Sequence, residues 1–134
     1  MEIYRSIDIE EAVRQALAGY MTAYCPPLQK DFRTPCILVT HTGGESQKTT
    51  TGKGKADMFT VVLDARAETE AEADETLRNA VAILEALETM FVDINSLYSW
   101  GTDPVRPDLA MCSATLLITA HREKVDLEEE SNES

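Results

Sequence analysis

The chain has 134 residues, which matches one domain of ordinary size. Its 24 acidic and 12 basic residues give a formal charge of −12, so its field repels phosphate backbones and anionic lipid. It has no run of 18 apolar residues and no basic region followed by an apolar one, so we expect a soluble, unexported protein with no membrane contact and no specific nucleic-acid binding.

A first helix is predicted from Asp8 to Tyr24. Asp8 can cap it, and apolar side chains then recur at three- and four-residue spacing up to Tyr24. Pro26 and Pro27 are expected to end it, because the residue before a proline leaves the α region and proline donates no backbone hydrogen bond. An extended linker to Pro35 follows.

Two strands and a polar loop come next. The segment of residues 36–42 is short and rich in β-branched side chains, which predicts a strand. Apolar and polar side chains alternate from Met58 to Arg66, which predicts a second strand. Between them, residues 43–56 contain no apolar side chain larger than alanine. We expect this segment to form the mobile tip of a β-hairpin.

This loop is locally basic. It carries Lys48, Lys53 and Lys55 against one acidic residue, which predicts contact with an acidic protein surface. A phosphate loop is not indicated, because Lys53 is followed by glycine and then by a strand, where that motif requires serine or threonine and a helix.

A second helix begins after Thr69, which forms a capping box with Glu72. Its apolar stripe is Ala73, Leu77, Ala80, Val81, Leu84, Leu87 and Phe91. The carboxylates between Glu68 and Glu75 lack the alternating ligands and central glycine of a calcium loop, and a helix dipole favours them in a first turn.

Two more strands are predicted after this helix, at Ile94 to Trp100 and at Leu109 to His121. Tyr98 and Trp100 carry large contact areas with a polar group, and are either core residues or interface anchors. Residues 126–134 are acidic and almost free of apolar side chains, which predicts a disordered tail after a single domain at residues 1–125.

The predicted order is α-β-β-α-β-β, an α+β fold. One four-stranded sheet, mainly antiparallel or mixed, with both helices on one face would bury both apolar stripes. Strand order stays open, because a helical connection between the second and third strands permits a parallel pair.

No motif for catalysis or metal binding is found. His41 and His121 lie in predicted strands without a third ligand at a diagnostic spacing, and Ser46 lacks the surroundings of a nucleophile elbow. The three cysteines are odd in number and widely spaced, so no disulfide framework or zinc ribbon is indicated. We expect no cofactor, no metal and no enzymatic activity.

Several features together resemble the small tail-terminator and tail-completion proteins of long-tailed bacteriophages and prophages. They are the capped helix from Asp8, the prolines before the strand at residues 37–40, the polar loop, and the strand-to-helix passage from Val61 to Ala73. A proline-bearing connection and a last alternating strand complete the resemblance, which covers nearly the whole chain.

The resemblance implies a structural role. Such proteins form rings, typically hexamers, that cap the tail tube and join it to the head connector; they work in the host bacterial cytoplasm during assembly and then in the virion tail. DNA passes through the ring, and an acidic ring would let it pass without binding. The residues themselves suggest two interaction candidates, the loop with Lys48, Lys53 and Lys55, and the strand with Tyr98 and Trp100.

Two alternatives remain open. One is another neck or head-completion protein of the same structural class. The other is a small-ligand-binding or enzymatic α+β domain, in which Cys112, His41 or His121 would line a pocket.

Overall fold

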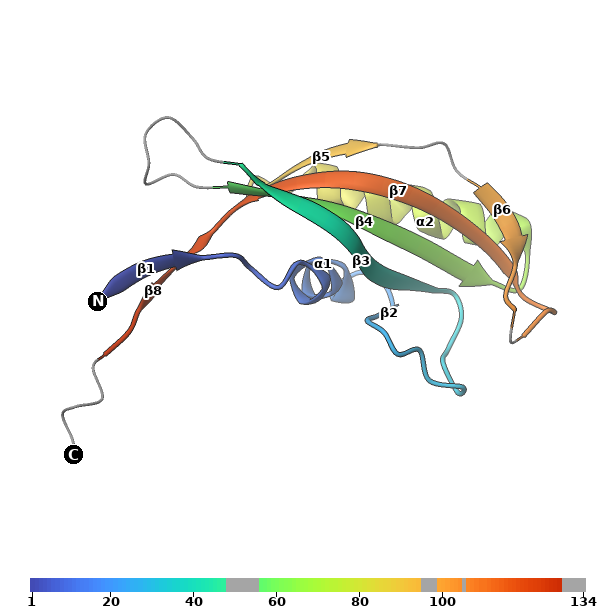
Figure 1. The fold of residues 1–134 in the computed structure, drawn as a ribbon. Coiled ribbons are helices and arrows are strands. Elements are labelled where there is room, and N and C mark those ends of the chain that lie inside the picture. The colour runs from blue at the N-terminus through green and yellow to red at the C-terminus, as the bar shows by residue number, and fades with distance from the viewer. Residues whose placement is uncertain (48–55, 95–98, 105, 129–134) are drawn as a thin grey trace.

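The computed structural model describes residues 1–47, 56–94, 99–104 and 106–128. In chain order its elements are β1 (Glu2–Arg5), α1 (Ile9–Ala18), β2 (Ala23–Tyr24), β3 (Cys36–Gln47), β4 (Ala56–Ala67), α2 (Glu70–Glu85), β5 (Met90–Ile94), β6 (Ser99–Thr102), β7 (Ala110–His121) and β8 (Glu123–Asp126). The expected α+β class is confirmed (Figure 1).

Among the described residues the main sheet has six strands, and the prediction of four is wrong. Its order is β2-β3-β4-β7-β5, and β6 also pairs with β7. β2 pairs parallel with β3, and the other neighbours are antiparallel. The helical connection does not create the parallel pair, because β5 pairs with β7 and not with β4.

The length of β7 explains why two strands, β5 and β6, stand where one was predicted; the other additional strand is β2, which pairs with β3. Its 12 residues span about 40 Å, more than one short strand can cover. β5 therefore lies along residues 116–120 and β6 along residues 110–113 of the same edge. The single strand predicted from Ile94 to Trp100 is wrong, because β5 ends at Ile94 and β6 starts at Ser99, with residues 95–98 outside the described part of the chain.

Helix α1 begins where predicted and ends early. The Asp8 carboxylate accepts a hydrogen bond from the Glu11 backbone at 3.3 Å, which confirms the cap. The helix ends at Ala18 and not at Tyr24, because Gly19 costs about 1 kcal/mol inside a helix and Ala23–Tyr24 instead pairs with β3. The pairing of Ala23–Tyr24 with β3 has therefore outweighed the helical spacing of the apolar residues in this segment.

Helix α2 confirms its predicted start. The Thr69 hydroxyl accepts from the Glu72 backbone at 3.2 Å, and the helix ends at Glu85. Leu87 and Phe91, which continue its apolar stripe in sequence, therefore lie beyond the helix, Phe91 in β5.

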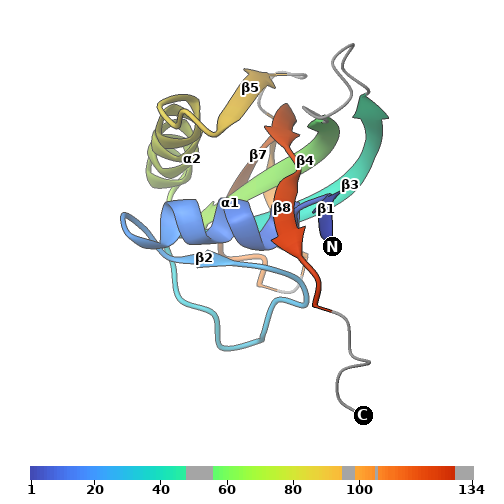
Figure 2. The ribbon, with the colours of Figure 1, turned by 90° about the vertical axis from the view of Figure 1, so that its left-hand side faces the viewer.

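Both helices pack on one face of the sheet, as predicted (Figure 2). The shared core contains buried residues of α1, α2 and the alternating inward positions of three strands, β3, β4 and β7. These are Ile9, Val13, Leu17, Ile37, Val39, Phe59, Val61, Leu63, Ala65, Ala67, Ala73, Leu77, Ala80, Val81, Leu84, Cys112, Ala114, Leu116, Ile118 and Ala120. The clean alternation of β7 in sequence correctly located its inner face.

The hairpin strands extend further than expected. β3 runs to Gln47 and β4 starts at Ala56, with a register shift between His41 and Gly43, so residues 43–47 pair with residues 56–60. This extension is seen as backbone pairing, which a search for apolar side chains misses. Residues 48–55, the remainder of the predicted mobile loop, lie outside the described residues.

The acidic tail also begins later than predicted. Asp126 belongs to β8, which pairs antiparallel with β1 to form a separate two-stranded ribbon. Residues 129–134 are outside the described part, and the expected disorder there stays a prediction. Figure 1 shows the ribbon leaving the body at one end of the sheet, with the N-terminus on that side.

A second, smaller cluster covers part of the opposite sheet face. Phe32 of the linker, Cys36 and Leu109 bury one another, and the Arg106 guanidinium lies 4.9 Å from the centre of the Phe32 ring. The linker predicted as extended thus supplies core residues of its own.

A buried ion pair lies on the same sheet face, at the end of β4. Arg66 Nε donates to Asp103 Oδ2 at 3.0 Å, and the two residues are 7% and 2% exposed. The Nη1 atom of Arg66 is buried and has no hydrogen-bond partner among the described residues.

Candidate interaction surfaces

Of the five residues predicted to form contacts, only Trp100 lies in the described part of the chain. It sits on β6 opposite Cys112, and half of its surface is exposed. Trp100 is therefore no core residue in the isolated chain, which leaves the interface alternative. Lys48, Lys53, Lys55 and Tyr98 lie outside the described residues.

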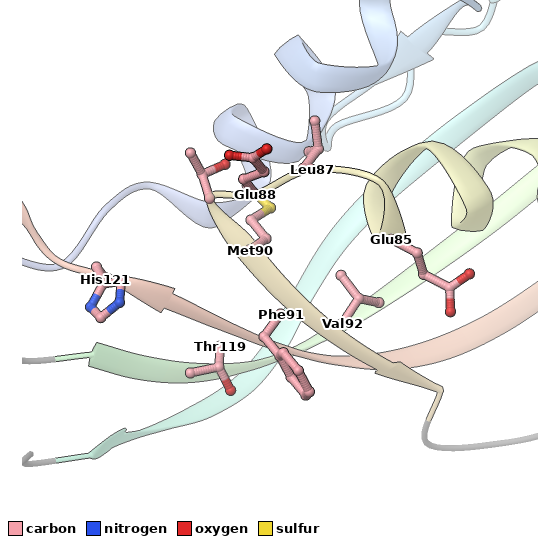
Figure 3. Close-up of a pocket in the computed structure, with 9 residues that line it drawn as sticks. Glu85, Leu87, Glu88, Met90, Phe91, Val92, Thr119 and His121 are labelled. Atoms are coloured by element: carbon pink, nitrogen blue, oxygen red, sulfur yellow. The ribbon is translucent and has the colours of Figure 1, made fainter.

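The outer edge of the sheet exposes further apolar side chains. Phe91 and Ile94 on β5 are 68% and 49% exposed, and β5 and β6 both pair with β7 along one side only. We call Phe91, Ile94 and Trp100 the β5/β6 edge. Figure 3 shows Phe91 and Val92 leaving β5 in opposite directions. The sequence pattern placed Phe91 in the apolar stripe of the second helix, although the residues from Thr89 to Val92 have the composition of a strand.

Two open hollows flank the segment that joins α2 to β5. Each has a volume of about 460 Å³, and both are lined by Leu87, Thr89, Met90 and His121. One continues along β5 and contains Glu85 and Glu88 (Figure 3); the other continues along α1 and is largely apolar.

These hollows contain few side chains that could take part in catalysis. His121 is the one histidine that lines either of them. His41 is not part of them. The centre of its ring lies 5.3 Å from the centre of the Phe59 ring in an edge-to-face arrangement, and its backbone N–H donates to the Glu10 carboxylate at 2.8 Å. Among the described residues, no three histidine, cysteine or acidic side chains are grouped to hold a metal ion.

The cysteines are placed as small apolar side chains. Cys36 and Cys112 are fully buried, and neither lines either of the two hollows described above. Burial raises the pKa of the Cys36 thiol to about 11 and also raises the pKa of Cys112. Burial likewise raises the pKa of half-buried Cys25, with Glu10 adding to the effect. None of the three is poised as a thiolate nucleophile.

The sheet face opposite the helices is half-buried and rich in threonine. Its two central strands, β4 and β7, present Thr60, Thr115 and Thr119 there, and Ser113 donates to the Asp64 carboxylate. A mixed face of this kind suits solvent or a polar partner, and contrasts with the apolar β5/β6 edge.

Charged groups meet at the base of the ribbon. The Arg122 guanidinium binds both carboxylate oxygens of Asp57 at 3.0 Å, and the Ser6 hydroxyl donates to the same carboxylate at 2.5 Å. Asp57 is 4% exposed, and its hydrogen bond raises the pKa of Arg122. Together, the bidentate pair of Arg122 with Asp57 and the hydrogen bond from Ser6 connect both ribbon strands to β4.

Within the described residues, no helix is long and apolar enough to cross a membrane. The predicted helix-end carboxylates hold no ion site; Asp74 pairs with Arg78 at 2.8 Å along the helix surface.

Comparison with known proteins gives little guidance. No family model matches the sequence, and no curated protein matches it. Among solved structures, the chain is similar to one chain of "Virion of native gene transfer agent (GTA) particle", with 13% identity, a TM-score of 0.46, and coverage of 82% of this chain and 85% of that chain.

Proposed function

We propose that the chain is a structural assembly protein of a phage or prophage virion, a tail terminator. Its ring, a hexamer in the family that it resembles, would cap the tail tube and join it to the head connector. It acts in the host cytoplasm during assembly and then in the virion tail.

The observation that carries this proposal is the apolar β5/β6 edge. Phe91, Ile94 and Trp100 are 68%, 49% and 50% exposed along the outer strands β5 and β6; Ile94 and Trp100 lie on the helix-covered face of the sheet, and Phe91 lies on the opposite face. Large apolar and aromatic side chains exposed along a sheet edge are typical of protein contacts, because their exposure to water is unfavourable. The passage from Val61 to Ala73, on which the resemblance rests, forms the central strand β4 and the start of α2.

The absence of an enzyme's apparatus supports the same role. In the described residues the two histidines are in different surroundings, the buried thiols have raised pKa values, and the hollows lack a nucleophile with an adjacent base. We propose that the protein is not an enzyme and needs no cofactor.

The charge suits a ring around DNA. A formal charge of −12 repels the phosphate backbone, so DNA would pass through the ring without being held. The basic residues Lys48, Lys53 and Lys55 would then face an acidic partner protein, either the tail-tube protein or the head connector.

A neighbouring neck protein would share these features and differ in its partner. Purified chain should bind tail-tube protein if it is a terminator, and connector protein alone if it is a neck component. Size-exclusion chromatography with light scattering, on the chain alone and with each partner, separates the two. A strict monomer that binds neither partner would contradict both.

The partner contacts are tested by substitution. Phe91→Glu and Trp100→Glu should each weaken partner binding at least about tenfold, because each places a charge in a desolvated contact. Reversing Lys48, Lys53 and Lys55 to glutamate should weaken docking while the melting temperature stays within a few degrees. Glu128→Lys, a charge reversal at an exposed residue that belongs to neither candidate surface, is the control. Full binding by all variants would contradict the proposed surfaces.

A further inference from the structure

The ribbon of β1 and β8 lies outside the cores of the molecule. Within residues 1–5 and 123–127 no residue is buried, and none belongs to or packs against either hydrophobic cluster. β1 and β8 contact mainly each other among the described elements. A two-stranded ribbon alone is marginally stable in water, so this ribbon needs support from the rest of the domain.

The ion pairs within the ribbon do not supply that support. They join Arg5 to Glu123, Lys124 to Glu2, and Asp126 to the terminal amine, at 2.9 to 3.2 Å. All of these groups are exposed, and exposed pairs contribute little to stability because water screens them. These pairs also join the two strands to each other and not to the sheet.

One residue on each strand connects the ribbon to the domain. Ser6 stands between β1 and Ile7, which packs against the main core, and Arg122 stands between β7 and β8. Both of these residues bind the same group. Arg122 Nε and Nη2 each donate to an oxygen of the Asp57 carboxylate at 3.0 Å, and Ser6 Oγ donates to it at 2.5 Å. We call Ser6, Asp57 and Arg122 the clamp.

The acceptor of the clamp is fixed in the sheet. Asp57 lies in β4 opposite Ala120 of β7 and is 4% exposed, so its carboxylate cannot follow the ribbon. Charge-assisted bidentate hydrogen bonds are among the strongest that side chains form. The closed state is favoured, because opening takes the Arg122 guanidinium away from a buried carboxylate. Figure 2 shows β1 and β8 side by side at this end of the molecule.

We propose that the clamp is a conformational device that holds the ribbon closed, and that the ribbon opens from the domain as one unit when the clamp is broken. Because one carboxylate binds both connections, losing it releases both strands together. The two helices and the sheet keep their core, to which the ribbon contributes no residue. This is a local opening, separate from global unfolding, and it does not depend on the role in a virion.

Backbone order from ¹⁵N relaxation tests the proposal. In the wild type, the amides of Ile3 and Val125 should have order parameters of about 0.85, typical of a rigid backbone. In Asp57→Asn they should fall below about 0.6, because the substitution removes the charge that binds Arg122. The amides of Leu63 and Leu116, which are buried in the main core, should keep their wild-type values.

Two further variants complete the experiment. Asp64→Asn removes the same charge from the same strand at a residue that binds Ser113, and should leave the ribbon ordered. Asp57→Leu combined with Arg122→Met breaks the clamp without leaving a buried charge, so the domain should stay folded even if Asp57→Asn unfolds it. In this double variant the ribbon should lose its order while the core amides keep theirs.

Three results would overturn the proposal. Ribbon amides that stay ordered in both clamp variants would show that other contacts hold the ribbon. Loss of order in ribbon and core amides together in the double variant would show that ribbon and domain are one cooperative unit. Wild-type ribbon amides with order parameters below about 0.6 would show that the clamp does not hold the ribbon closed.

Discussion

Replacing Asp103 with asparagine removes one charge from the buried pair with Arg66. The guanidinium would remain 7% exposed with its charge uncompensated, and its Nη1 atom already has no hydrogen-bond partner among the described residues. Breaking a buried pair from one side costs about 3–5 kcal/mol, because desolvation of the remaining charge is no longer offset. We expect Asp103→Asn to lower the free energy of unfolding by about 3 kcal/mol and the melting temperature by about 10 °C.

A surface pair supplies the control for this measurement. Asp74 and Arg78 are also paired, at 2.8 Å, but the Arg78 side chain is largely exposed. Exposed pairs contribute at most about 1 kcal/mol, so Asp74→Asn should change stability little. Urea unfolding followed by circular dichroism measures the stability of both variants. An unchanged m-value shows that each variant exposes the same amount of surface on unfolding as the wild type.

A double replacement separates charge from packing. Arg66→Met with Asp103→Leu removes both charges, and should be more stable than Asp103→Asn alone, since hydrophobic replacements of buried pairs are often neutral. A loss below about 1 kcal/mol for Asp103→Asn would refute the reasoning, because it would mean that water reaches the guanidinium.

Three further predictions concern thiols, capping and pH. At pH 8 a thiol reagent should modify Cys25 first, and Cys36 and Cys112 only on unfolding, because burial raises their pKa values; rapid reaction of all three would contradict the placement of the two buried thiols. Thr69→Ala should cost about 1 kcal/mol in urea unfolding and Thr69→Ser much less, since the serine keeps the capping oxygen. The pKa of Glu11 lies at about 2, lowered first by its hydrogen bond from Arg14, so the stability it contributes is present above its ordinary value of 4.5 and is lost as pH falls towards 2; carboxyl titration by NMR showing a value near 4.5 would contradict this.

The sequence predicted those parts of the fold in which local signals and burial agree. Asp8 and Thr69 each cap a helix because their oxygens compete well for free backbone donors. The inward face of β7 follows from alternation, since every second side chain from Cys112 enters the same core. These features identify two helices on one sheet face.

The missed elements are those formed by backbone pairing between distant segments. β2, β1 and β8 have two to four residues each, too few for a periodic signal, and their partners lie elsewhere in the chain. Phe91 continued a helical stripe in sequence and became an exposed strand residue, because the strand pair with β7 replaced the helix. Of the candidate site, Trp100 could be named from the sequence as a candidate anchor, and the structure shows that it is half exposed; the hollows depend on packing that no local pattern encodes.

The pairing of β1 with β8 sets an order of events during synthesis. Met1 and Asp126 are 125 positions apart and yet hydrogen-bonded, so β1 has no partner until β8 has left the ribosome. Closing so long a loop is entropically unfavourable until the intervening sheet has folded and brought the ends together. Because β7, the partner of β4, β5 and β6, lies directly before β8 in the chain, the sheet and the ribbon both close late, when the C-terminal part of the chain becomes available.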